Sequence, residues 1–440
     1  MKSTIINWWI QICTSYWFIP SLMAVCAVVA SIVVVNLDVL LGNAWISNYP
    51  GLYATQPAGA RALLSMVAGS MITVAGVTFS MTLLAVSHAS AQFGPRLLSG
   101  FMRNRGNQFT LGTFIATFLY CLMVLRAVHA GTDGESEQAI SIFVPHLAIL
   151  LAVVLAILSV AVLIYFIHHV PQSISIANVI AGVGVELVHG IQSLYPQKIG
   201  QALPADSTPS SDPENVTDIG CDICVDCVGG YLRVLDTEGL LQLATEKELL
   251  VKLLLRPGEF AITGQPLLRV WPPERVDDNL ERALHNLFSW GTERTREQDL
   301  MFPAEQLIEV LGKAMSPGIN GQYTAVLCLN QFERAFAELL QRQVPDSHRY
   351  DEHENLRVVA SPITHEDFLV GVLCPVRQFV RGDWITTNHL LKILKRLTEM
   401  PGLQDAVPIV TKEMEKIRQE VESGSMIDSE KALLLAIIND

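Results

Sequence analysis

The sequence has few charged residues for its length, which excludes an ordinary soluble protein. Only 17% of its 440 residues are Asp, Glu, Lys or Arg, and its mean hydropathy is +0.36. A typical soluble protein has about 25% charged residues. The deficit lies in one half, because residues 1–200 contain twelve charged residues and residues 201–440 contain 61. The composition therefore predicts a membrane domain followed by a soluble domain.

The chain also lacks a basic soluble half and the common catalytic motifs. Residues 201–440 have a net charge of −15, whereas nucleic-acid binding requires a basic surface. The sequence contains no G-x-x-x-x-G-K-[ST], no H-E-x-x-H and no G-x-S-x-G, and no G-x-G-x-x-G after a strand. We therefore expect no nucleic-acid partner, no cofactor and no enzymatic activity.

Four apolar runs are long enough to cross a bilayer, which takes about 20 helical residues. They are approximately Trp17–Leu37, Ala62–Val86, Phe109–Val128 and Phe143–Ile167. These runs predict a membrane α-helical bundle of four spans, with the first retained as a signal anchor. They contain no Asp or Glu, so a carboxylate proton relay inside the membrane is hard to build.

Charge in the loops predicts the orientation. The loop between the second and third runs carries three bases and no acid: Arg96, Arg103 and Arg105. The next loop carries three acids and no base: Asp133, Glu135 and Glu137. Because Lys and Arg stay on the cytoplasmic side, both termini and the soluble domain are expected in the cytoplasm, with Arg61 as the one exception.

The second run contains a stripe of small and hydroxyl side chains. Five of these residues fall within an arc of about 80° on a helix, and one large residue interrupts the stripe. They are Ser65, Gly69, Thr73, Gly76 and Ser80, followed by Leu83. Such a stripe favours close helix packing, or it lines a pore in which Leu83 forms a hydrophobic constriction. Both hold if the packing partner is the same helix of another subunit.

Titratable groups lie near the ends of the spans. Arg126, near the outer end of the third run, either snorkels to the headgroups or attracts anions at a pore mouth. His88, His168 and His169 lie at the expected cytoplasmic ends. Interfacial histidines are common, and a cluster of them can also titrate near neutral pH.

Composition divides the chain into five parts. They are a four-span domain (1–170), an amphipathic connecting helix (171–198), a flexible linker (199–219), a small β-rich module (220–273) and a mainly helical cytoplasmic domain (274–440). The connecting helix is expected on the membrane surface or against the soluble domain. The last two parts form a cytoplasmic α+β domain. In residues 256–270, RPGEFAITGQPLLRV is typical of the paired hairpins of barrel-sandwich modules, without the exposed Lys of a carrier.

Three cysteines in CDICVDC have metal-ligand spacing. Cys221, Cys224 and Cys227 form two C-x₂-C pairs, which zinc or an iron–sulfur cluster can use. However, the segment leads into a predicted strand, where residues three apart face opposite sides. No fourth ligand is near in sequence, so we predict no metal site.

Five ordered segments carry a family resemblance. They are SMITVAGVTFSMTLLAVSHASAQFGPRLL, LGTFIATFLYCLMVLR, RPGEFAITGQPLLRVWP, ERTREQDLMFPAEQLIEV and AMSPGINGQYTA. In this order the chain resembles, over about residues 10–400, the bacterial "domain of unknown function 2254" predicted membrane proteins. The resemblance implies a multi-pass protein of the bacterial inner membrane.

The last of these segments predicts a connector between two helices. It contains Ser316, Pro317, Gly318, Ile319 and Asn320. Pro and Gly end one helix and Asn320 can cap the next, although a ligand-binding loop is an alternative. This chain has Gly321 and Gln322 where the family typically has Asp-Pro, which puts a role for that acid in doubt.

Together these features predict a homo-oligomeric channel or channel-like transport protein with a cytoplasmic gate or vestibule. Four spans enclose little space alone, so transport requires several copies of the chain. The alternative is a membrane-anchored scaffold or sensor. The expected partners are copies of itself, membrane lipid, and an ion or solute whose charge stays open: the arginines favour anions and the acidic domain favours cations.

Overall fold

The computed structural model describes residues 16–41, 56–93, 105–129, 143–195, 220–227, 229–400, 407–424 and 426–439. The chain divides into two compact units, Trp9–Ser175 and a second unit that contains Ile176–Asp440, and each is described by itself. The loop charges that predict the orientation, apart from Arg105, lie outside the described residues, as do most of the connections between the spans.

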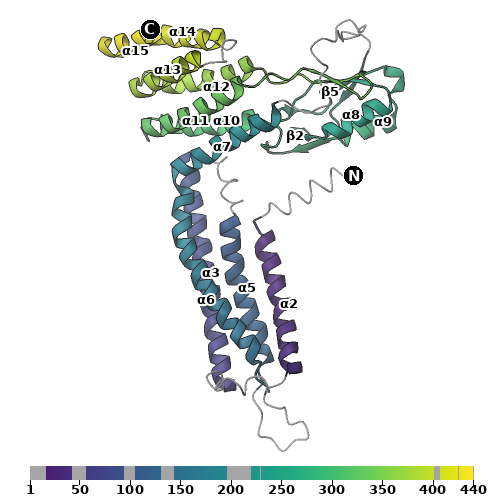
Figure 1. Ribbon diagram of the computed structural model, residues 1–440, viewed down its shortest axis with the longest axis vertical. Coiled ribbons are helices and arrows are strands. Elements are labelled where there is room, and N and C mark those ends of the chain that lie inside the picture. Colours follow the sequence, from purple (N-terminus) through teal and green to yellow (C-terminus); the bar gives the residue numbers. More distant parts are fainter. Residues whose placement is uncertain are drawn as a thin grey trace, which may run out of the picture. The chain divides into compact units, whose positions relative to one another are not determined.

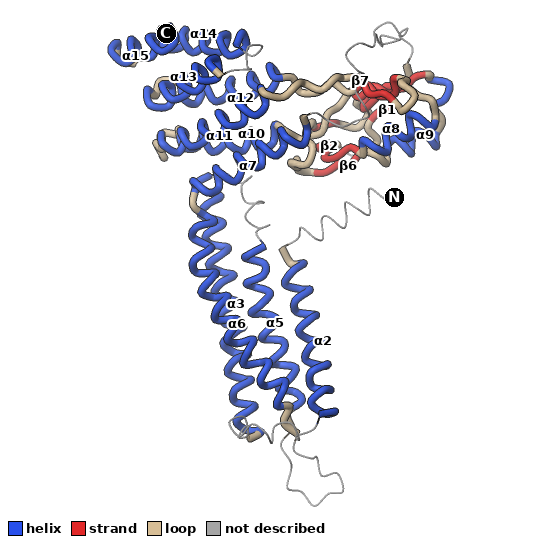
Figure 2. The backbone as a smooth tube through the Cα atoms, in the orientation of Figure 1, coloured by secondary structure: helices blue, strands red, loops and turns tan. Residues whose placement is uncertain are grey.

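The first unit consists of long helices that run side by side (Figures 1 and 2). They are α2 (Phe18–Leu41), α3 (Pro57–Phe93), α5 (Arg105–Ala127) and α6 (His146–Ile174). Together with α7 (Ile176–Leu194) of the second unit, five helices are long and apolar enough to cross a membrane. All four predicted runs are therefore helical, but length and composition allow five crossings. The fifth candidate, α7, has the lowest hydropathy, 1.2.

Helix α5 forms the centre of this bundle and contacts α2, α3 and α6. Its Phe114, Tyr120 and Val124 are almost fully buried. Helix α3 packs small and apolar residues into the same core, including Ala60 and Ala68. These alanines allow close approach of the helix backbones, which is how apolar helices associate in a membrane.

The bundle contains a carboxylate that the apolar runs did not include. Helix α2 continues to Leu41 and so contains Asp38, which is 7% exposed. Its two carboxylate oxygens accept hydrogen bonds from the backbone N–H groups of Leu147 and Ala148, both at 3.0 Å. Because Pro145 offers α6 no side-chain cap, Asp38 supplies one from another helix. The expectation that the spans lack acids is therefore wrong for the end of α2.

The second unit contains two open sheets, which follow α7 in the chain. The five-stranded sheet has the order β1 (Cys221–Cys224), β5 (Pro266–Trp271), β3 (Leu250–Leu253), β8 (Leu356–Val359) and β7 (His348–Tyr350). The three-stranded sheet has the order β4 (Phe260–Ala261), β2 (Gly230–Leu235) and β6 (Phe288–Gly291). Neighbouring strands are antiparallel, except that β3 and β8 are parallel.

These sheets do not form the expected barrel-sandwich module. No barrel is closed in the part of the chain that the structure describes. The reason is long-range pairing: Val251 of β3 pairs with Val358 of β8, about a hundred residues downstream. A local hairpin pattern cannot reveal such a partner. Helices α8 (Thr237–Glu246) and α9 (Asp278–His285) contribute to the same apolar core as these strands.

The remaining helices stack in successive layers beside the sheets (Figure 1). They are α10 (Met301–Ala314), α11 (Gln322–Leu340), α12 (His365–Val380), α13 (Trp384–Glu399), α14 (Val407–Ser423) and α15 (Asp428–Asn439). Helix α7 buries Ile180, Leu187 and Ile191 and contacts α10 and α11. The apolar side of the predicted connecting helix therefore packs on α10 and α11.

Candidate functional site

The stripe on α3 lies on a free face of the single chain. Its members are all exposed: Ser65, Gly69, Thr73, Gly76, Ser80 and Leu83. A Cβ added at Gly69 or Gly76 would have no atom within 4 Å. The residues of α3 that pack into the bundle lie on another face and include Ala60, Leu64, Ala68, Met71 and Ala75. Among the described residues, the stripe therefore takes no part in the packed core of the bundle.

A strip of large apolar side chains adjoins the stripe on the same free face. Its exposed members are Met66, Val77, Met81 and Leu84. Large side chains of this kind suit acyl chains, whereas the missing side chains at Gly69 and Gly76 leave a groove for a neighbouring helix. The Thr73 hydroxyl donates to the Gly69 carbonyl at 2.8 Å, so its polar hydrogen is satisfied within α3.

Helix α5 carries a second polar stripe that faces into the bundle, and the apolar runs did not reveal it. Its members are the buried Thr110, Thr113 and Thr117, which share an arc of about 60° on the helix, and Asn107 and Gln108 of the first turn are buried as well. The Thr117 and Ser159 hydroxyls are 3.0 Å apart and hydrogen-bonded. Within the described residues, neither side-chain polar atom of Asn107 has a hydrogen-bond partner. The threonine spacing of three and four residues is the sequence signal that would have identified this stripe.

Two basic residues near the ends of α3 and α5 have different surroundings. Arg126 is exposed in the last turn of α5, where the sequence placed it. Arg61 of α3 donates to the Val128 carbonyl at 2.8 Å. This hydrogen bond satisfies a backbone carbonyl just beyond α5 and ties the two helices together. Arg61 thus has a structural partner that its position beside the second apolar run did not predict.

The three histidines do not share one helix. His88 belongs to α3, whereas His168 and His169 are in α6. The Nε2 atom of His168 lies 3.1 Å from Nε2 of Gln172, and His169 stacks on Tyr165 with ring centroids 5.0 Å apart.

The connector Ser316–Asn320 joins α10 to α11. The Ser316 carbonyl accepts hydrogen bonds from the N–H groups of Ile319 and Asn320 at 3.0 and 2.9 Å. Asn320 has a φ of 50°, and its side chain accepts from Gln322 at 3.0 Å. The N-cap of α11 is Gly321, so Asn320 is not the helix cap that the motif suggested. Its left-handed backbone turns the chain one residue earlier.

The cysteine motif lies partly in a strand, as its sequence indicated. Cys221 and Cys224 are in β1, and Asp222 between them binds Arg269 through two hydrogen bonds of 2.5 and 2.9 Å. These bonds lower the pKa of the Asp222 carboxyl. Cys227 packs against the core of the sheets. Among the described residues, no group of three or more His, Cys, Asp or Glu side chains is placed to hold a metal ion.

Two of the sequence segments that carry the family resemblance meet in the second unit. Arg294 binds Asp299 and Glu305, each at 2.6 Å, and Asp299 also accepts from the N–H groups that begin α10. Gly258 of the other segment has a φ of 94°, and a Cβ there would collide with the Asp299 carboxylate. Glycine at 258 therefore allows the turn to lie directly against this buried ion cluster.

A cavity of about 530 Å³ adjoins this junction. Arg256, Glu259 and Gln298 line it, and both segments thus contribute to its wall. The Gln298 side chain accepts from the Leu235 N–H at 2.8 Å and donates to the Leu235 carbonyl at 3.0 Å. Gln298 is thereby held in place by β2.

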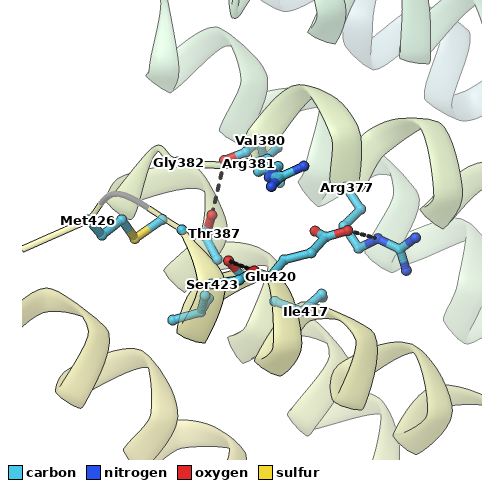
Figure 3. A pocket seen from close by; sticks show the side chains of 11 residues that line it. Arg377, Val380, Arg381, Gly382, Thr387, Ile417, Glu420, Ser423 and Met426 are labelled. Atoms are coloured by element: carbon cyan, nitrogen blue, oxygen red, sulfur yellow. Dashed lines mark hydrogen bonds and ion pairs between the residues drawn. The ribbon is translucent and has the colours of Figure 1, made fainter. Parts of the chain in front are cut away.

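A second cavity, of about 400 Å³, lies among α12, α13 and α14. Figure 3 shows Arg377 and Glu420 pointing toward one another in its wall, where they form an ion pair of 2.9 Å. Arg377 also contacts the buried Glu413 at 3.2 Å. Because two carboxylates already balance this guanidinium, the pair serves to hold α12 against α14.

The geometry defines a class: a protein with several apolar helices of membrane-spanning length and an α+β C-terminal unit. The chain belongs to the DUF2254 family of predicted membrane proteins, whose family model matches residues 13–396. It is 29% identical to an uncharacterized protein of Mycobacterium bovis and 28% identical to one of Mycobacterium tuberculosis, each over 361 residues. These matches cover 79% of this chain and 65% of each relative, so the chain spans about two-thirds of their length. No solved structure matches.

Proposed function

We propose that this protein is a homo-oligomeric channel of the bacterial inner membrane and has no enzymatic activity. One observation carries the proposal: the small-residue stripe of α3 is exposed, and no atom of the described residues lies within 4 Å of a Cβ added at Gly69 or Gly76. An exposed groove of this kind is suited to the helix of another chain. The hydroxyls of Ser65, Thr73 and Ser80 would then line a path beside the seam between subunits.

The packing of the first unit supports a path between chains rather than within one. Tyr120, Phe114 and Leu64 are 0–1% exposed and fill the region where α3, α5 and α6 meet. A bundle filled in this way leaves conduction to the outer faces of its helices. The free face of α3 carries exposed hydroxyls at Ser65, Thr73 and Ser80.

The topology that we propose has four spans, with both termini in the cytoplasm. The arginine-bearing loop after the second span supports this orientation. Helix α7 packs its apolar side on α10 and α11, which favours its membership of the cytoplasmic domain over a fifth crossing. That domain would then act as a vestibule or gate, and Arg126 would face the outer mouth.

A scaffold or sensor without transport activity is the second candidate. The Thr73 hydroxyl, bonded to its own helix, favours it, because a packed seam needs no free polar atoms. In this case the stripe assembles the chains and encloses no path.

Flux through reconstituted protein separates the two candidates. Purified chain in liposomes should pass small ions, monitored with entrapped potassium- and chloride-sensitive dyes. Gly76→Leu fills the stripe and should abolish the flux. Val77→Leu, on the neighbouring apolar strip, is the matched control and should leave the flux intact. An assembled wild-type protein that passes neither ion would support the scaffold and contradict the channel.

A further inference from the structure

The cavity of about 530 Å³ lies where several parts of the second unit meet. The last turn of α7, the ends of β2 and β3, and the segment that follows β8 all contribute to its wall. Ligand pockets in proteins have volumes of about 300–1,000 Å³. The cavity therefore has room for a small organic molecule.

Much of the wall is apolar. Leu235 and Leu255 are 4% and 6% exposed, and Leu194, Leu253 and Ile363 line the cavity as well. These side chains favour a ligand with an apolar body, because its binding removes apolar surface from water.

Arg256 is the one base among the described residues that line the cavity, and it is half-buried. In the part of the chain that the structure describes, its guanidinium takes part in no ion pair. Burial raises the pKa of the Tyr195 phenol to about 12, and the positive charge of Arg256 opposes this rise. Tyr195 donates to the carbonyl of Ile363, which lines the cavity. The charge of Arg256 is therefore felt at this wall of the cavity.

The acid next to Arg256 in the wall is used by the backbone. Glu259 accepts the N–H of Arg256 at 3.0 Å and so closes the turn that contains Gly258. The guanidinium keeps its own donors, whose planar fork matches the two oxygens of a carboxylate. The carboxylate of Glu259 and the net charge of −15 on residues 201–440 repel a ligand with several negative charges. The charges of the site thus favour a single negative charge.

Two hydroxyls complete the polar part of the wall. They belong to Thr237, which is half-buried at the start of α8, and to Ser361, which is exposed. Within the described residues, neither hydroxyl has a hydrogen-bond partner. Each can donate one hydrogen bond to an oxygen of a ligand.

We propose that this cavity binds a small monocarboxylate with an apolar body, in which the carboxylate pairs with Arg256 and the body packs on the leucines of the wall. Ser193 and Leu194 of α7 border the cavity, so a bound ligand joins α7 to the sheets. The inference concerns the second unit alone and does not depend on channel activity.

Titration with phenylpropionate tests the proposal. The full chain in nanodiscs is titrated by calorimetry, with empty nanodiscs subtracted. Phenylpropanamide has the same body without the charge and should bind about tenfold more weakly, which is the loss expected for a charge-assisted hydrogen bond. Arg256→Gln should weaken binding of the acid to the level of the amide and leave the amide unchanged. Lys252→Gln removes a charge from β3 outside the cavity, so this matched control should bind both probes like the wild type.

A second variant locates the binding. Ser361→Trp places a bulky side chain at an exposed position of the wall and should weaken binding of both probes, with an unchanged melting temperature in the absence of ligand. Unchanged affinities in this variant would show that the probes bind elsewhere.

Three other results would overturn the proposal. They are the absence of binding by phenylpropionate, equal affinities of the acid and the amide in the wild type, and an affinity for the acid that Arg256→Gln does not change. Tighter binding of phenylethylphosphonate than of phenylpropionate would also contradict it, because the site would then take a doubly charged oxyanion.

Discussion

Helices α3 and α5 both carry stripes of small or hydroxyl side chains. The stripe on α3 faces away from the bundle, whereas the stripe on α5 faces into it. On α5 the threonines of the stripe face the bundle. On another side of the same helix Gly112 packs against α2 and leaves no room for a larger side chain: a Cβ would lie 2.6 Å from the Met23 sulfur and 3.2 Å from the Pro20 backbone. On α3 the glycines have empty space around them. The same residue types therefore serve the fold of one chain on α5 and remain available for another partner on α3.

This contrast shows that composition alone does not assign a stripe to packing or to function. The regular helical spacing of the α3 stripe led to the hypothesis that it lines a pore or packs on another subunit. The α5 stripe is nearly as regular, yet the structure uses it inside the core. Only the direction of each face, set by the neighbours of the helix, separates the two cases.

The largest difference should appear between two glycine substitutions. Gly112→Leu forces α5 away from α2, and overpacking of this kind costs about 3 kcal/mol. Gly76→Leu meets no atom of its own chain and should leave the stability of a single chain unchanged. Thermal unfolding of each variant in detergent, under conditions that keep the chains apart, measures the difference. Equal melting temperatures for the two variants would break the comparison.

Removal of the carboxylate that caps α6 should have a smaller effect. Asp38→Ala leaves the N–H groups of Leu147 and Ala148 without their acceptors, and loss of a helix cap costs about 1–2 kcal/mol. Asp38→Asn keeps one acceptor oxygen and should fall between this variant and the wild type. Thermal unfolding of the three proteins checks this order. An unchanged melting temperature in Asp38→Ala would show that the cross-helix cap does not stabilise the bundle.

The smallest effect should distinguish two threonines. Thr117→Val removes the hydrogen bond to the Ser159 hydroxyl and leaves that buried group unpaired, at a cost of about 1 kcal/mol. Thr73→Val removes only a bond to its own helix on the free face, so the stability of the single chain should not change measurably. Chemical denaturation of both variants measures the difference. A larger loss of stability in Thr73→Val would place that stripe inside the fold.

Much of the helical architecture could be predicted from the sequence, because about 20 apolar residues in a row have few alternatives to a long helix. The chain's membership of its family was also visible in five ordered segments. The sheets could not be predicted, since β3 pairs with a strand encoded about a hundred residues later.

The candidate site was only partly predictable for a related reason. Helical periodicity placed Ser65 to Leu83 on one face, but it could not show whether that face is inside or outside. Asp38 was missed because it follows the apolar run, although α2 continues through it. Asn320 was assigned as a helix cap because its residue type favours that role, whereas its backbone forms the turn and Gly321 begins α11.

The mass of the assembled protein in a lipid nanodisc tests the central claim most directly. Native mass spectrometry should give a multiple of the 48.4 kDa chain for the wild type and for Val77→Leu. Gly76→Leu should shift the population toward single chains, because the added side chain occupies the groove between helices. A wild-type protein that is monomeric in the bilayer would contradict the account, and so would a Gly76→Leu variant that assembles and conducts like the wild type.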